Sequence, residues 1–187
     1  MKKLLLFLMV IIIAAPVITS CKKGEEDPFL SLKSRKARLV GEWKLVSGTQ
    51  AYTSNGVDVR VTYSGSIASF VADFGVGSYP YVETMTFGKN NEFKKETIDN
   101  GKIRQYEGFW SFMNGNDEIA NKECIVVRKT KSFINDKLNI FSGDNMPVTV
   151  LRLLKLSSKE IILEYSGTEV SSETEYSTTS KITYEKK

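Results

Sequence analysis

Few side chains in this sequence have the types and spacing that catalysis needs. The chain has 187 residues and contains no histidine, which excludes Ser-His-Asp and Cys-His catalysis and removes the commonest general acid–base residue. Glu83, Glu107 and Glu164 lie on expected β-strands, and a pair that met inside a barrel could cleave a glycosidic bond. Outward-facing glutamates on surface strands explain these positions more simply. We therefore predict that the protein is not an enzyme.

The two cysteines have different surroundings. The chain starts with a methionine and two lysines, continues with an almost unbroken apolar run of 15 residues over 4–18, and reads Ile-Thr-Ser directly before Cys21. Because a membrane-spanning helix needs about 20 apolar residues, this segment fits a secretory signal peptide. An aliphatic residue, two small residues and a cysteine form the pattern that lipoprotein signal peptidase cleaves. We predict that residues 1–20 are a signal peptide and that Cys21 is the site of lipid attachment.

With Cys21 lipidated, Cys124 has no partner for an internal disulfide. It lies in the segment Glu-Cys-Ile-Val-Val, whose composition favours a β-strand. Without a histidine to activate it, we expect a buried and unreactive thiol. No phosphate-binding glycine-rich loop follows a strand, and no cysteine pair has the spacing of metal ligands. We therefore expect no cofactor and no metal.

Residues 21–38 are expected to form a tether between the lipid and a folded domain. A lysine follows Cys21, and an acidic cluster occupies residues 25–27. This pattern resembles the export signal of lipoproteins that reach the outer cell surface in the Bacteroidetes. We predict a lipid anchor in the outer membrane of the cell envelope, with surface exposure as a hypothesis and a plain solvated tether as the alternative.

The net charge of +4 does not describe the folded domain. The signal peptide contributes +2 and the tether +3, so residues 39–187 carry a net charge of −1. Such a domain lacks the basic surface that nucleic-acid binding requires. The expected partners are therefore the membrane, through the lipid on Cys21, and a small molecule, but no nucleic acid.

Beyond residue 41 the apolar residues alternate with a period of two, as they do in β-strands. Nine strands are expected, at residues 43–46, 57–63, 81–87, 93–98, 104–113, 123–130, 148–156, 161–165 and 180–185. Many short strands joined by tight turns indicate an all-β sandwich or barrel, and a barrel is favoured because closure removes exposed edges. Residues 39–187 are thus predicted to form one antiparallel β-barrel of about eight to nine strands.

Two segments depart from this alternation. Apolar residues recur at helical spacing from Ile67 to Phe74, between two glycines, which predicts one short amphipathic helix. That helix could plug one end of the barrel as ordinary core, or it could act as a mobile lid over a cavity. Residues 166–180 are rich in Ser, Thr and Glu and fit either a polar hairpin or a flexible loop.

The sequence Gly41-Glu42-Trp43 resembles the Gly-x-Trp opening of the lipocalins, and a second Gly-x-Trp ends at Trp110. Together with the signal sequence and Cys21, these motifs make the chain similar to lipocalin-like lipoproteins of the Bacteroidetes. The resemblance implies that Gly41 and Trp43 form a structural plug at the closed end of the barrel. The chain lacks the Thr-Asp-Tyr box and the framework disulfide of true lipocalins. It has no arginine after Arg152, so Arg152 or a lysine would have to pack on the tryptophan.

The resemblance and the many inward-capable aromatic residues predict a lipocalin-like barrel that binds a small apolar ligand. The candidate cavity residues are Tyr63, Phe70, Phe74, Met85, Phe87, Trp110 and Phe112. The alternative is a structural or interaction protein of the cell envelope with a filled barrel, and a weaker one is an inhibitor of a secreted enzyme. An interior packed solid by Trp43, Phe87 and Trp110 would leave no room for a ligand.

Overall fold

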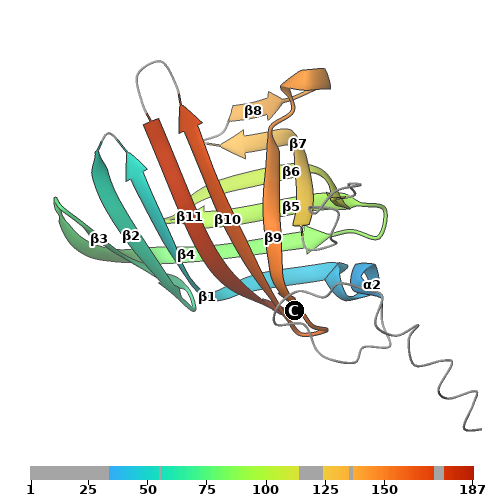
Figure 1. Cartoon of the computed structure of the whole chain (residues 1–187), viewed down its shortest axis with the longest axis horizontal. Coiled ribbons are helices and arrows are strands. Elements are labelled where there is room, and N and C mark those ends of the chain that lie inside the picture. Colours follow the sequence, from blue (N-terminus) through green and yellow to red (C-terminus); the bar gives the residue numbers. More distant parts are fainter. Residues whose placement is uncertain (1–33, 55, 114–123, 135–136, 171–174) are drawn as a thin grey trace, which may run out of the picture.

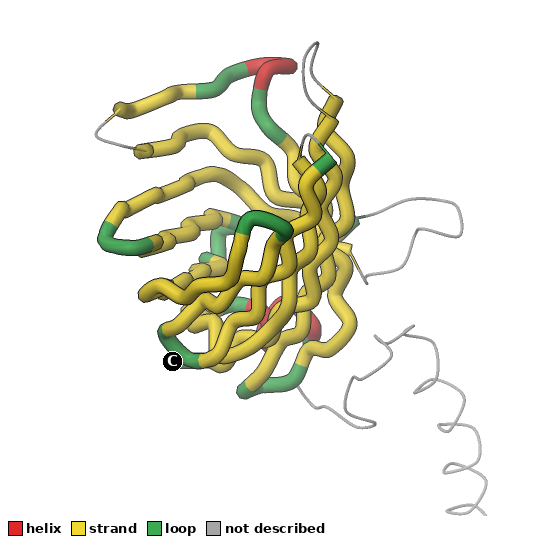
Figure 2. Tube along the Cα trace, turned by 90° about the vertical axis from the view of Figure 1, so that its left-hand side faces the viewer, coloured by secondary structure: helices red, strands yellow, loops and turns green. Residues whose placement is uncertain are grey.

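The computed structural model describes residues 34–54, 56–113, 124–134, 137–170 and 175–187. The predicted signal peptide, the lipid site Cys21 and the tether up to residue 33 lie outside these ranges. The described chain is almost entirely β-strand, as Figure 2 shows in yellow. No helix among the described residues is long and apolar enough to cross a membrane.

The elements, in chain order, are α2 (Arg35–Leu39), β1 (Gly41–Ser54), β2 (Val57–Ser64), β3 (Ile67–Ala72), β4 (Gly75–Phe87), β5 (Glu92–Asp99), β6 (Lys102–Phe112), β7 (Cys124–Ile134), β8 (Lys137–Ile140), the 3-10 turn η2 (Gly143–Asn145), β9 (Val148–Leu156), β10 (Glu160–Val170) and β11 (Glu175–Lys186) (Figure 1).

The strands form a closed antiparallel barrel. The hydrogen-bonded order is β6-β5-β4-β3-β2-β1-β11-β10-β9-β7-β8, and an additional β6–β7 ladder closes the ring. β8 pairs with β7 alone and lies outside the ring. The predicted all-β class and antiparallel closed barrel are confirmed. The predicted number of eight to nine strands is wrong, because the ring has ten strands plus the outer strand β8.

The helix predicted between Gly65 and Gly75 is wrong, and with it the helical plug and lid. This segment is β3 together with the turns on either side, and β3 pairs with both β2 and β4. Its apolar residues lie on both faces of the strand, since Ala68 is buried whereas Val71 is exposed. The helical spacing of the apolar residues was therefore a misleading signal. Within the described part of the chain the short α-helix is α2, which brings residues 35–38 of the expected tether onto the barrel.

The polar segment 166–180, expected to be either a hairpin or a flexible loop, is a hairpin over its described part. β10 and β11 stay paired from Glu160↔Glu185 to Val170↔Glu175. Residues 171–174, which connect the two strands, lie outside the described residues.

The barrel has two different ends. Near α2, β1 pairs directly with β4, from Gly41↔Phe87 to Lys44↔Thr84. Farther along, β1 pairs with β2 and β4 pairs with β3, so the β2–β3 hairpin is inserted between them. The ring therefore has eight strands around the end near α2, called here the narrow end, and ten around the opposite, wide end.

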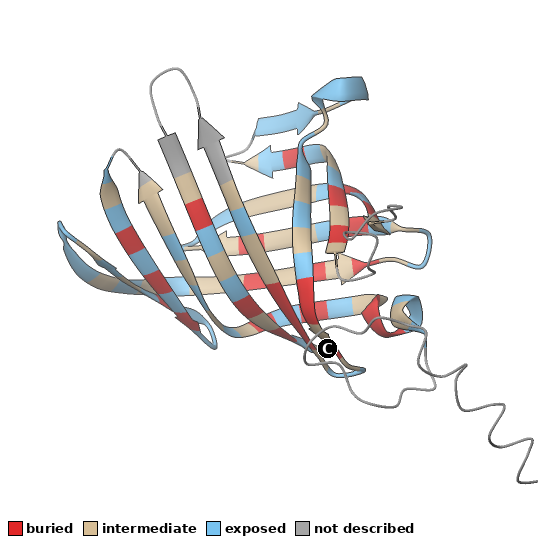
Figure 3. Ribbon diagram, in the orientation of Figure 1, coloured by how far each residue is buried: buried red, intermediate tan, exposed pale blue. Residues whose placement is uncertain are grey.

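The narrow end is filled by aromatic side chains. Phe87 packs edge-on against Trp110 with ring centroids 5.7 Å apart and lies 5.4 Å from Phe93. Leu39 of α2 is fully buried in the same hydrophobic cluster. Figure 3 shows that the buried residues become continuous in β9 and β10 close to α2.

Trp43 is fully buried at this end, and its indole Nε1 donates a 2.7 Å hydrogen bond to the carbonyl of Leu39. The Nζ of Lys186 lies 4.9 Å from the Trp43 ring centroid and donates to the carbonyl oxygens of Arg38 and Val40. A lysine thus packs on the tryptophan where the resemblance implied an arginine. Gly41 permits this approach, because a Cβ there would collide with the Lys186 side chain.

The packing of the narrow end predicts different effects for two neighbouring aromatic residues. Trp110 is 3% exposed, whereas Phe109 is 54% exposed on the outer face of the same strand. Trp110→Ala is expected to lower the free energy of unfolding by about 3–5 kcal/mol because it opens a cavity in packed core. Phe109→Ala, the matched control, is expected to change it by less than about 1 kcal/mol. Urea unfolding of both variants measures the difference, and equal losses would contradict this packing.

Candidate ligand-binding cavity

A cavity of about 660 Å³ lies inside the barrel, between the packed narrow end and the wide end. Among the described residues seven tyrosines line it: Tyr52, Tyr63, Tyr79, Tyr81, Tyr106, Tyr165 and Tyr184. Three of them form a continuous cluster, with ring centroids 4.8 Å apart for Tyr63 and Tyr81 and 6.5 Å apart for Tyr79 and Tyr81. A volume of this size is within the range of small-molecule sites.

The structure brings together two of the seven candidate cavity residues, Tyr63 and Met85, in the lining. Three others belong to the packed narrow end and its border: Phe87, Trp110 and Phe112, the last 5.6 Å from the Trp110 ring. The strand alternation correctly indicates that such residues point inward. It does not report their depth along the barrel, which separates lining from core.

The last two candidate residues lie at the β3–β4 hairpin. Phe70 packs against Tyr79 and Phe74, with centroid distances of 6.4 Å and 6.2 Å, and is not in the cavity lining. Phe74 is 72% exposed in the turn. Both residues were assigned to the cavity because a helix was predicted over Ile67 to Phe74. The segment forms β3 and the following turn instead, which places both residues away from the cavity.

Glu83 is the functional candidate that sequence reasoning missed. We expected outward-facing glutamates, but Glu83 is only 4% exposed and points into the cavity. Glu107 and Glu164 do pair on more exposed positions, with Lys131 and Arg152 respectively. The available signal was the strand 81–87, where Glu83 stands at a spacing of two from Tyr81 and Met85 and therefore shares their face.

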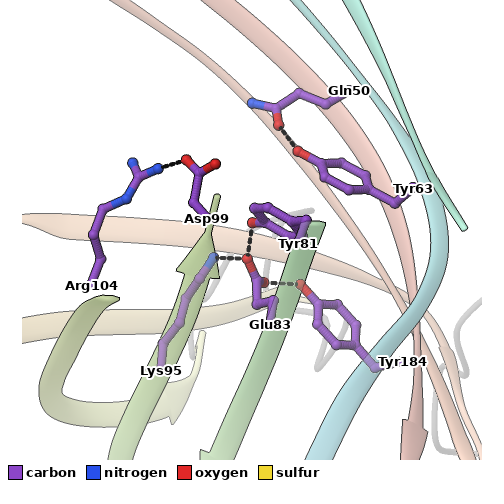
Figure 4. Close-up of polar contacts among 8 residues, drawn as sticks. All are labelled: Gln50, Tyr63, Tyr81, Glu83, Lys95, Asp99, Arg104 and Tyr184. Atoms are coloured by element: carbon purple, nitrogen blue, oxygen red, sulfur yellow. Dashed lines mark hydrogen bonds and ion pairs between the residues drawn. The ribbon is translucent and has the colours of Figure 1, made fainter. Parts of the chain in front are cut away.

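Three side chains from different strands hold the Glu83 carboxylate (Figure 4). The hydroxyl of Tyr184 on β11 donates to Oε1 at 2.5 Å. On the other oxygen, Oε2, the hydroxyl of Tyr81 donates at 2.7 Å and the Nζ of Lys95 on β5 lies at 2.9 Å. This set joins β4, β5 and β11 through the barrel interior.

These contacts fix the protonation states. Burial alone would raise the pKa of Glu83, but the charge of Lys95 and the hydrogen bonds from Tyr184 and Tyr81 outweigh burial, so that pKa is lowered. Burial, followed by the negative charge of Glu83, raises the pKa of both Tyr184 and Tyr81. At neutral pH the site is therefore a charged carboxylate held by two protonated phenols and by its ion pair with Lys95.

A second ion pair, Arg104 with Asp99, lies beside the first on the same wall (Figure 4). The strand register places Glu83 opposite Thr97, and Thr97 opposite Arg104. We call the four side chains Glu83, Lys95, Asp99 and Arg104 the charged wall. Both of its ion pairs run diagonally between neighbouring strands.

A neutral polar chain lies near the wide end. The hydroxyl of Tyr63 donates to Oε1 of Gln50 at 2.7 Å, and the Gln50 amide donates to Oγ1 of Thr178 at 3.3 Å. Phenol, amide and hydroxyl groups of this kind can donate to a bound molecule as well as accept from it. The cavity thus offers aromatic faces, hydrogen-bonding groups and fixed charges together.

Cys124 is half-buried at the start of β7, rather than buried as expected. It does not line the cavity.

The chain matches no family model, and a search of the curated proteins finds no match.

Removal of Lys95 tests the electrostatics of the charged wall. Lys95→Met leaves the buried carboxylate without its cation, which is expected to cost about 3 kcal/mol of unfolding free energy at pH 7. Lys94→Met, on the adjacent exposed lysine, is the matched control and is expected to cost less than about 0.5 kcal/mol.

The same variant has a characteristic pH dependence. In the wild type the lowered pKa of Glu83 contributes stability above the ordinary glutamate pKa, and this contribution is lost as pH falls through the lowered value. In Lys95→Met the cation is gone, so we expect burial to raise the pKa of Glu83, and folding then takes up a proton. The variant's loss of unfolding free energy relative to wild type should therefore shrink as pH falls. Denaturant unfolding between neutral and acidic pH measures this, and a deficit that does not vary with pH would contradict the assignment.

Proposed function

We propose that this chain is a lipid-anchored protein of the cell envelope whose barrel binds a small amphipathic ligand. The observation that carries the proposal is the cavity of about 660 Å³ above the packed narrow end. Its lining combines apolar and aromatic side chains with the two ion pairs of the charged wall. A ligand with an apolar body and at least one polar group fits such a lining, and it narrows the small, mostly apolar ligand expected from the sequence.

The alternative of a filled barrel with a purely structural role has less support. Trp43, Phe87 and Trp110, the residues expected to fill it, pack together at the narrow end. The volume above them is bordered by charged and hydroxyl-bearing side chains, which do not pack densely on one another without a partner or water. We therefore favour ligand binding.

We place the protein among lipocalin-like lipoproteins. The closed antiparallel barrel and the buried Trp43 beneath a cationic side chain support this placement. The anchor rests on the sequence before and at Cys21, and the basis for an outer-membrane, surface-exposed position is the lysine and acidic cluster that follow it. The proposal includes no catalytic step, nucleic acid, metal or cofactor.

Filling the cavity is the direct test of ligand binding. Thr178→Trp places an indole in the lining, because Thr178 is buried and faces the cavity, whereas Thr179→Trp on the exposed neighbouring position is the matched control. The probe is 1-anilinonaphthalene-8-sulfonate, an aromatic anion whose fluorescence rises in apolar sites. We expect Thr178→Trp to weaken its binding at least about tenfold, or 1.4 kcal/mol, and Thr179→Trp to bind like wild type. Absence of saturable binding to the wild type would contradict the proposal.

The anchor is tested by metabolic labelling with an alkyne analogue of palmitate. Cys21→Ser is expected to abolish incorporation of the label and to release the protein from the membrane fraction, because the acyl chains supply the anchoring energy. Cys124→Ser, the matched control, should keep both the label and the membrane association. Equal labelling of the Cys21→Ser variant and the wild type would rule out lipidation at Cys21.

A further inference from the structure

The barrel wall is incomplete between β9 and β10. These strands are paired only from Ile161↔Leu156 to Glu164↔Arg152. Beyond this point β10 continues to Val170 paired with β11, and residues 148–151 of β9 belong to the ladder with β7. Figure 1 shows the two strands diverging from their common base near α2 toward the wide end. We call the opening between residues 148–151 and 165–170 the slot.

The cavity extends into the slot. Thr149 and Leu151 of β9 and Tyr165 of β10 are among its lining residues, as expected for side chains on the inner face. Val148 and Glu164, which alternate with them and so belong to the outer face, line the same cavity. The ladder between the two strands ends at Glu164↔Arg152, so residues at the edges of the slot can border the cavity.

The slot and the charged wall lie on different sides of the barrel. In the ring of ten strands toward the wide end, β6, β7 and β9 separate β5 from β10 on one side, and β4, β3, β2, β1 and β11 separate them on the other. At least three strands therefore lie between β5, which carries Lys95 and Asp99, and β10. A molecule that crosses the cavity has charges at one end and the slot at the other.

The β9 edge of the slot is apolar. Val148 and Val150 are 54% and 39% exposed, and Leu151 is half-buried beside them. Exposed valines at the border of a cavity suit an apolar chain that passes over them. A peptide that added as a β-strand would need edges at constant spacing, which two diverging strands do not offer.

We propose that the slot is a side portal through which the apolar chain of a single-chain amphiphile leaves the cavity, while its polar head lies toward the charged wall. The inference rests on the proposed ligand-binding function and adds the direction of the ligand. Molecules longer than the cavity are then accepted, because only the head and the first part of the chain are enclosed.

The experiment closes the slot with a disulfide in the full chain. If the β9–β10 ladder continued past Glu164↔Arg152, Ser166 would lie opposite Val150, so the variant is Val150→Cys with Ser166→Cys. Cys124→Ala is added to prevent exchange with the native thiol. Two probes are compared: 1-anilinonaphthalene-8-sulfonate, which fits inside the cavity, and dodecanoic acid with a nitrobenzoxadiazole fluorophore on its methyl end.

We expect both probes to bind the wild type. In the oxidised variant the labelled fatty acid should bind at least about tenfold more weakly, whereas the naphthalene probe should keep its affinity. Reduction with dithiothreitol should restore fatty-acid binding. Equal fatty-acid binding to the oxidised and reduced forms would overturn the portal alone. Failure of both probes to bind the wild type would instead overturn the proposed function on which it rests.

A second pair of variants keeps the portal testable if the disulfide does not form. Val148→Glu places a charge on the edge of the slot, and Val76→Glu places the same charge on an equally apolar position of β4 that is 76% exposed. Val148→Glu is expected to weaken the labelled fatty acid about fivefold or more, since the chain would have to desolvate a carboxylate, and Val76→Glu should not. Equal affinities of the two variants would contradict the portal.

Discussion

The buried carboxylate of Glu83 is the constraint on which the interior of this barrel depends. An unpaired charge at such a depth would cost several kcal/mol, and Lys95, Tyr81 and Tyr184 compensate for it from three strands. These hydrogen-bonded charges border the cavity, in contrast to the aromatic side chains that fill the narrow end.

The strand arrangement provides the space. The β2–β3 hairpin enters between β1 and β4 only beyond the narrow end, so the barrel widens from eight strands to ten. The short β9–β10 ladder leaves these two strands unpaired with each other toward the wide end. The packed narrow end, the cavity and the slot thus follow one another along a single barrel. The position of each depends on where a ladder between two strands begins or ends.

The sequence was sufficient for the fold class, for the inward face of most strands and for the burial of Trp43. It was insufficient where local pattern and tertiary pairing differ. The segment from Ile67 to Phe74 has helical spacing, but pairing with β2 and β4 makes it a strand. Glu83 was placed outside because a glutamate is usually exposed, although its strand position next to Met85 indicated the opposite. Depth along the barrel, which separates Met85 in the cavity from Phe87 in the core, is set by register and is not encoded in alternation.

The titration of Glu83 itself tests the charged interior of the barrel directly. The chain is labelled with ¹³C at glutamate side-chain carboxyls, and the Glu83 resonance is assigned by its absence in Glu83→Gln. We expect a titration midpoint below that of an ordinary glutamate, because Lys95 and two phenols stabilise the charged form. A midpoint in the ordinary range or above it would contradict the buried, charge-paired state of Glu83 in the charged wall.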